Sequence, residues 1–302
     1  MRFHLSRMSW VCLYEKVQCS VILFLLTPGY FLFHMTVIRA NLVALYNPGP
    51  VQHWCHFFMS CFFYINVFGN LIMATFTDTS LKKNFGSSYA FDGGTYCEIC
   101  KKLRPPKSWH CPKCNVCILR RNHHCYFISR CIGMNNQRYF LLYLTYILIS
   151  LVYSTYHDFF FVASEFENKL EFLVSIIPIM ALTAPVVRLL LQGSYRVTDL
   201  YAFLLNLNLF LIVCFWTCVR YHWQNAIEGM TSYERVILER KNHPNARNTD
   251  EVPLIRKVGP GDWKKNLIKV FGTRWYLAIL IPFADSPLPE TEDACQKVVM
   301  GD

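Results

Sequence analysis

Long apolar runs alternate with polar, charged stretches along this chain of 302 residues. Three runs lie at about 17–38, 53–76 and 139–162, and a fourth covers 200–219. Each is long enough to cross a bilayer, which takes roughly 20 helical residues. A cleaved signal peptide is the alternative for the first run, but its length and the runs that follow favour a membrane helix. The pattern predicts an α-helical polytopic membrane protein.

One further apolar run, 172–191, is interrupted by Pro178, Pro185 and Arg188. If this run and 200–219 both crossed the bilayer, the C-terminal region and the stretch 77–138 would lie on opposite sides of the membrane. Both of those regions are rich in Lys and Arg, which marks the cytosolic side. Parity therefore favours about four transmembrane helices, with 172–191 luminal-side, interfacial or re-entrant. A five-span arrangement stays open.

The same pattern divides the chain into four regions. They are 1–76 (a basic leader and spans 1 and 2), 77–138 (a cytosolic cysteine-rich domain), 139–221 (spans 3 and 4, with the extra segment 172–191) and 222–302 (a cytosolic C-terminal region).

Composition supports a membrane protein. Hydrophobic residues make up 53% of the chain, a fraction that exceeds the usual range for a soluble domain. The mean hydropathy is +0.23, which agrees with a membrane protein. The net charge of +10 alone would suggest nucleic acid or an anionic membrane surface as a partner. The apolar runs favour the lipid bilayer and argue against nucleic acid.

Half of the fourteen cysteines lie between 97 and 131, together with three of the ten histidines. Their C-x2-C pairs indicate metal ligands in a reducing compartment, where disulfides do not persist. Iron–sulfur clusters seldom draw on three histidines, so we predict zinc. Two closed tetrahedral zinc sites use eight of these ten residues and leave His123 and Cys125, which can do chemistry. The zinc ions are expected to be structural, because a small loop-rich module lacks a core of its own.

The arrangement resembles the cysteine-rich domain of the DHHC-type protein S-acyltransferases, the membrane palmitoyltransferases, which lies between the second and third spans. The resemblance implies that Cys125 is the nucleophile that takes the acyl group. It implies one zinc site made of Cys97, Cys100, His110 and Cys117, and a second made of Cys111, Cys114, His124 and Cys131.

Three C-terminal stretches extend the resemblance. Thr231-Ser232-Tyr233-Glu234 is similar to the family's Thr-Thr-x-Glu element. The segment from Asn266 to Gly272 resembles the element whose Asn supports packing near the active site. Ser286 to Pro289 matches the tail of the short family members.

The chemistry fits this resemblance. A thiolate is the attacking form of cysteine, and His123 can take the thiol proton. Palmitoyl-CoA or another long-chain acyl-CoA would be the donor, and Arg120 and Arg121 could contact the CoA phosphates. The acceptors would be cysteines of membrane or membrane-associated proteins. The family default is the endoplasmic reticulum or Golgi membrane, with a cytosolic active site.

The chain departs from the family pattern at Asn122, where the signature has Asp. In the serine-protease triad, the same Asp to Asn change costs about 10⁴ in turnover. Tyr126-Phe127 replaces the usual Pro-Trp, and Asp78-Thr79-Ser80 replaces Asp-Pro-Gly. The favoured function is a protein-cysteine S-palmitoyltransferase. The alternative is a catalytically impaired relative that acts as a membrane zinc-domain binding or scaffolding protein.

Overall fold

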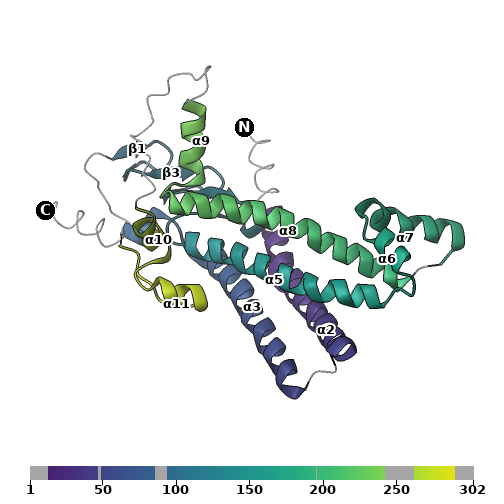
Figure 1. The fold of residues 1–302 in the computed structure, drawn as a ribbon. Coiled ribbons are helices and arrows are strands. Elements are labelled where there is room, and N and C mark those ends of the chain that lie inside the picture. The colour runs from purple at the N-terminus through teal and green to yellow at the C-terminus, as the bar shows by residue number, and fades with distance from the viewer. Residues whose placement is uncertain (1–12, 47–48, 86–93, 195, 242–261, 290–302) are drawn as a thin grey trace. The chain divides into compact units, whose positions relative to one another are not determined.

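The computed structural model describes residues 13–46, 49–85, 94–194, 196–241 and 262–289, and Figure 1 labels their helices and strands. The chain divides into two compact units. The first contains Asn66–Tyr143 with the described parts of 1–25 and 220–302, and the second contains Leu26–Ile65 and Leu144–Val219. Because the long helices run from one unit into the other, neither unit is a continuous stretch of sequence.

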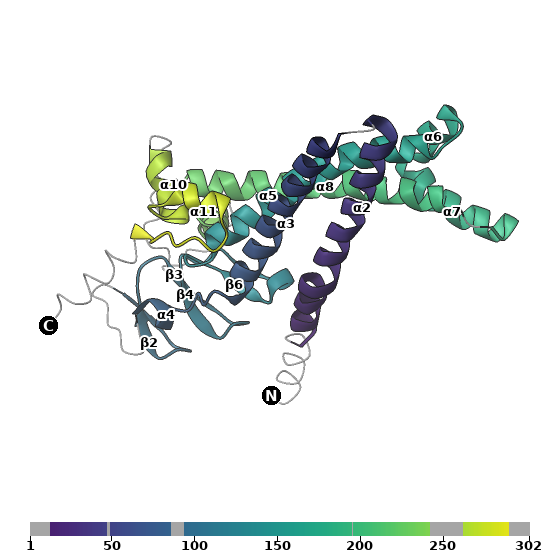
Figure 2. The same ribbon diagram turned by 90° about the horizontal axis from the view of Figure 1, so that it is seen from below.

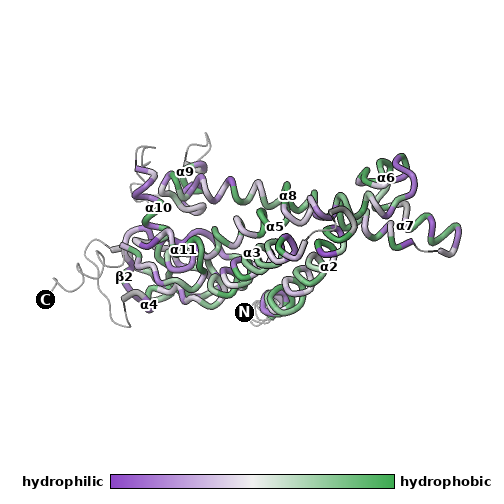
Figure 3. Tube along the Cα trace, turned by 60° about the horizontal axis from the view of Figure 1, so that its bottom comes forward, coloured by the Kyte–Doolittle hydropathy of each residue, from purple (hydrophilic) through white to green (hydrophobic). Residues whose placement is uncertain are grey.

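Four helices in the described part of the chain are long and apolar enough to cross a membrane. The first runs from Leu13 to Val43 and includes the π-helical turn η1 (Ile22–Leu26) and most of α2 (Thr27–Tyr46). The others are α3 (Pro50–Phe76), α5 (Gln137–Ser164) and α8 (Val197–Ile227). Figure 3 shows apolar residues along most of α2 and α3. These helices confirm the predicted membrane architecture.

The interrupted run at 172–191 folds as two helices, α6 (Lys169–Ser175) and α7 (Pro178–Gln192), with an 86° bend between them. Pro178 is the first residue of α7, where its missing N–H loses no helical hydrogen bond. The bend means that this run is not one straight spanning helix. A fifth span requires the bent pair to be counted as one.

Polar side chains join the spans inside the second unit. The amide nitrogen of Asn41 lies 3.0 Å from His157 Nδ1, and both side chains are buried. Asn208 donates a hydrogen bond of 2.7 Å to the carboxylate of Asp158. Hydrocarbon offers polar groups no other partner, so these pairs determine which helix faces meet.

The cysteine-rich module lies between α3 and α5 and consists of three two-stranded antiparallel ribbons. Its elements are α4 (Leu81–Phe85), β1 (Thr95–Cys97), β2 (Lys102–Arg104), β3 (Ser108–Cys111), β4 (Val116–Leu119), β5 (His123–Cys125), η2 (Tyr126–Ile128) and β6 (Arg130–Ile132). The ribbons pair β1 with β2, β3 with β4, and β5 with β6.

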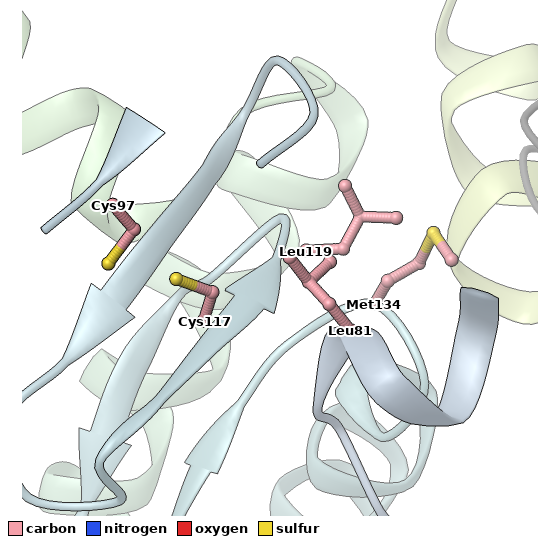
Figure 4. Close-up of a cluster of buried hydrophobic side chains, with 5 residues drawn as sticks. All are labelled: Leu81, Cys97, Cys117, Leu119 and Met134. Atoms are coloured by element: carbon pink, nitrogen blue, oxygen red, sulfur yellow. The ribbon is translucent and has the colours of Figure 1, made fainter. Parts of the chain in front are cut away.

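The apolar core of this module is small. One buried cluster contains Leu81, Cys97, Cys117, Leu119 and Met134. In Figure 4 the sulfur atoms of Cys97 and Cys117 point toward one another, apart from the other three side chains. A second cluster contains Cys111, Ile118 and Cys131. Half of these core residues are cysteines, so the folding of the module depends on what their sulfur atoms bind.

Asn136 fixes the module to the end of α3. Its side chain is fully buried, and its amide nitrogen donates to the carbonyl oxygens of Ala74 on α3 and Cys131 on β6, at 2.9 and 3.1 Å. Its side-chain oxygen accepts the N–H of Gly133 at 2.9 Å.

Asp78, in the Asp78-Thr79-Ser80 stretch, closes a turn by accepting the N–H of Ser80 at 2.9 Å.

The described C-terminal helices are α9 (Ser232–Lys241), α10 (Trp263–Phe271) and α11 (Trp275–Leu280). Figures 1 and 2 both place α10 beside α11. Asn266 on α10 is buried and donates to the carbonyl oxygen of Ile227, near the end of α8, at 2.9 Å. Ser286 accepts the N–H of Arg274 at 3.1 Å and donates to the carbonyl oxygen of Phe271 at 2.7 Å.

Candidate active site and metal centres

Strand pairing assembles the first predicted metal site. His110 and Cys117 are directly opposite in the β3–β4 ribbon. Cys97 ends β1, and the turn that follows returns Cys100 to it, with the Cys100 N–H 3.4 Å from Cys97 Sγ. The ligand atoms of these four residues all lie within 4.8 Å of one another.

The second site repeats this design. His124 and Cys131 are opposite in the β5–β6 ribbon, and the Cys114 N–H lies 3.5 Å from Cys111 Sγ. His124 Nδ1 lies 3.7, 3.3 and 3.7 Å from the sulfur atoms of Cys111, Cys114 and Cys131. Ligand atoms of a tetrahedral zinc site are roughly 3.5–3.8 Å apart, so three sulfurs and one nitrogen at these distances fit Zn²⁺.

The two ligand sets share one spacing. Each ligand of the first site is followed 14 residues later by its counterpart: Cys97 by Cys111, Cys100 by Cys114, His110 by His124 and Cys117 by Cys131. The residue after each C-x2-C pair, Lys101 or Asn115, has a positive φ of 55°. This internal repeat is visible in the sequence but was not predicted from it.

Side chains alternate along β5, which separates His123 and Cys125 from His124. Successive side chains of a strand point to opposite faces, so His123 and Cys125 share one face while His124 faces the second metal site. Cys125 is buried, with 6% of its surface exposed. Burial raises the pKa of its thiol, and the backbone N–H groups of Ile128 and Phe127, in the following 3₁₀ turn, oppose that rise.

His123 is also enclosed. Its ring lies 5.2 Å from the ring of Phe140 and 5.4 Å from that of His222, which the sequence prediction did not include. Burial is the main cause that lowers the pKa of His123 to about 3, and electrostatic interactions with His222, Arg121 and His124 add to it. The imidazole is therefore neutral at physiological pH, with one ring nitrogen unprotonated.

Asn122 contacts the C-terminal element. It is buried, and its side-chain oxygen accepts the backbone N–H of Ser232, at the start of α9, at 2.6 Å. Thr231 and Glu234 close a capping box there, because each side chain accepts the other residue's N–H, at 3.1 and 2.7 Å. The Thr-Ser-Tyr-Glu stretch thus presents a helix N-terminus to the signature residue.

The two arginines predicted to contact CoA lie just before the signature. Arg120 is buried, with 4% of its surface exposed. Arg121 packs over the ring of Tyr233, with 5.0 Å between its guanidinium carbon and the ring centre. A contact between either arginine and a CoA phosphate stays a prediction.

One residue near the site was missed. Glu15, on the first helix, is 3% exposed and lies 2.9 Å from His124 Nε2 and 2.9 Å from Lys113 Nζ. From the sequence, its neighbourhood was predicted to be a basic leader. The available signal was that Glu15 is the first acidic residue of the chain, with the next at Asp78.

Comparison with known proteins agrees with this geometry. Residues 90–239 match the family model described as DHHC palmitoyltransferase. A probable palmitoyltransferase ZDHHC24 from Rattus norvegicus is 25% identical over 84% of this chain and 84% of its own length. Palmitoyltransferase ZDHHC22 from Danio rerio is 25% identical over 84% of this chain and 83% of its own. Palmitoyltransferase ERF2 from Kluyveromyces lactis is 46% identical, but over only 19% of this chain and 16% of its own.

The metal-ligand geometry, the four candidate spans and these similarities agree with one another. The chain belongs to the DHHC palmitoyltransferase family and is, by class, a protein S-acyltransferase.

Proposed function

We propose that this protein transfers a long acyl chain from acyl-CoA to Cys125 and from there to cysteines of membrane or membrane-associated proteins. The observation that carries the proposal is the position of Cys125. It shares a strand face with the neutral His123 and heads a 3₁₀ turn whose N–H groups point at its sulfur. These N–H groups stabilise the thiolate that the reaction requires, against the burial that raises the pKa of the thiol.

In the first step, His123 takes the proton of the Cys125 thiol as Sγ attacks the thioester carbon of the acyl-CoA. The tetrahedral intermediate collapses, the carbon–sulfur bond to CoA breaks, and His123 returns the proton to the departing CoA sulfur. In the second step, a substrate thiol attacks the acyl group on Cys125 in the same manner. Cys125 regains its proton, and a new thioester forms on the substrate.

The eight Cys and His ligands are suited to hold two structural zinc ions. Thiolate and imidazole ligands at these distances fit that metal, and metal binding folds a module whose apolar core is this small. The role of these residues is to fix β5, and with it His123 and Cys125, against the rest of the module.

We place the module on the cytosolic side of the membrane. Its Lys/Arg-rich stretch supports that orientation, and acyl-CoA would be available there. Palmitoyl-CoA is the donor we would test first. The endoplasmic reticulum or Golgi stays the predicted membrane.

Autoacylation tests this function. The purified protein in detergent is incubated with labelled palmitoyl-CoA, and wild type is compared with Cys125→Ser. We expect wild type to take up hydroxylamine-sensitive label and the variant to take up none, while both contain two zinc ions per chain. Cys61→Ser, which removes another free thiol, is the matched control and should label normally. Label that persists in Cys125→Ser would remove Cys125 from the mechanism. A silent wild type with both zinc ions bound would reject acyl transfer.

A further inference from the structure

The two metal sites differ in what their histidines contact on the far side of the ring. Both His110 and His124 face their sulfur ligands through Nδ1. The other nitrogen of His110, Nε2, is buried and has no hydrogen-bond partner among the described residues. Nε2 of His124 lies 2.9 Å from the Oε2 atom of Glu15. Only the second site therefore has an outer carboxylate at its histidine within the described structure.

Glu15 comes from outside the cysteine-rich module. It lies on the first candidate spanning helix, 98 residues before Lys113 and 109 before His124, and is 3% exposed. A carboxylate at this degree of burial is costly unless it is paired and hydrogen-bonded. Glu15 uses both oxygens, since Oε1 lies 2.9 Å from Lys113 Nζ. Glu15 thus connects the first helix to the second metal site through an ion pair with Lys113 and a contact with His124.

Such a carboxylate has a defined effect on a metal ligand. When a carboxylate accepts the N–H of one imidazole nitrogen, the other nitrogen is left free of a proton and can bind metal. The ring is also held in one orientation, and its basicity rises. At His124 these effects would act on Nδ1, the atom surrounded by the three cysteine sulfurs.

The contacts of Glu15 reach both sequence neighbours of the nucleophile. His124 precedes Cys125, and Tyr126 follows it. Lys113, the second partner of Glu15, places its Nζ 4.9 Å from the centre of the Tyr126 ring. The ring of Tyr126 also packs edge-on against His124, with 5.6 Å between ring centres. Glu15 therefore braces the strand and the turn that meet at Cys125.

We propose that Glu15 is a positioning residue of the second metal site, which it completes by fixing the orientation of His124 from the first membrane helix. Its effect on acyl transfer rests on the function proposed above, whereas its effect on the metal does not. The second site thereby depends on a helix that the first site does not need.

Zinc release from the full-length protein tests this assignment. A cavity of about 440 Å³ is lined by Glu15, Lys113, Cys114 and His124, so a small chelator can approach the second site. Purified wild type and Glu15→Gln are challenged with graded amounts of a chromophoric zinc chelator. The cysteines exposed at each step are alkylated and identified by mass spectrometry. Loss of an outer-sphere partner typically lowers metal affinity about 10- to 100-fold. We expect that change at Cys111, Cys114 and Cys131, and none at Cys97, Cys100 and Cys117.

Two control variants separate positioning from general destabilisation. Glu98→Gln removes an exposed carboxylate within the first site's C-x2-C turn, where it pairs with Lys101, and should leave both sites unchanged. Glu15→Asp keeps the charge, and its second-site affinity should lie between those of wild type and Glu15→Gln. Equal weakening of both sites in Glu15→Gln, or no weakening of either, would overturn the proposal. Because metal release is measured without acyl-CoA, a wild type that fails to autoacylate leaves this result interpretable.

Discussion

Replacing Asn122 tests the bond between the signature and the C-terminal element. The Asn122 side chain accepts the Ser232 N–H at 2.6 Å, and both residues are buried. Asn122→Ala leaves that N–H without its acceptor, which costs about 1–3 kcal/mol. Hydrogen exchange at the start of α9 should then accelerate about 5- to 150-fold, at 1.4 kcal/mol per factor of ten.

Asn122→Asp should have the opposite effect. A charged acceptor makes a stronger hydrogen bond than a neutral one, and a negative charge at a helix N-terminus adds roughly 0.3–1 kcal/mol. The carboxylate must be desolvated, so we expect a net gain of about 1 kcal/mol and exchange about fivefold slower. The carboxylate would also favour protonated His123, and autoacylation should become faster.

Deuterium uptake of the peptide covering 230–236, followed by mass spectrometry on detergent-purified protein, measures both effects. Asn135→Ala is the matched control, because Asn135 is an asparagine of the same module whose amide donates to the backbone oxygen of Asp78. Unchanged uptake in Asn122→Ala would refute the inferred bond. Autoacylation of Asn122→Asp no faster than that of wild type would show that the neutral side chain does not limit proton transfer.

Three further outcomes follow from the geometry. The low pKa of His123, about 3, and the raised pKa of the Cys125 thiol keep both groups neutral between pH 6 and 8. The autoacylation rate should therefore be nearly independent of pH in this range, and a change in rate centred near pH 6.5 would contradict this. Gly229→Ala places a methyl group 2.7 Å from the Asn266 side-chain oxygen, at a residue whose φ is +68°. The free energy of unfolding, followed by thermal denaturation, should fall by about 1–2 kcal/mol. Gly29→Ala is the control and should cause no such loss, because nothing lies within 4 Å of its added methyl group. Complete removal of zinc should abolish autoacylation and the protease resistance of the module, and added Zn²⁺ should restore both.

The sequence predicted what depends on local pattern. The lengths of the apolar runs are enough to locate the four candidate spans. A membrane helix requires mainly a stretch of roughly 20 apolar residues, which is visible in the sequence. The eight metal ligands were grouped correctly through the family spacing, and the structure brings each group of four together. Of the three interruptions named in the run 172–191, Pro178 lies at the start of α7, after the 86° bend, whereas Pro185 and Arg188 lie inside α7.

The missed features are those that long-range contacts create. Glu15 and His124 are 109 positions apart, and Asn122 and Ser232 are 110 apart. No periodicity connects such positions, so their pairing depends on how the helices return to the module. The burial of Arg120 was also missed, since arginine side chains are mostly exposed.

The spacing of 14 residues bears on how a catalytic thiol could arise. One further step from Cys111 reaches Cys125, and one further step from Cys114 reaches Ile128, which cannot bind metal. The left-handed residue also recurs, at Ser129 with φ of 50°. Cys125, the proposed nucleophile, thus occupies the place of a metal-binding cysteine in a third copy of the same hairpin, a copy whose second cysteine is absent. Successive duplication of one hairpin would produce this series. In that case the proposed nucleophile would correspond to a metal-binding cysteine that lacks the partner needed to keep it bound to a metal.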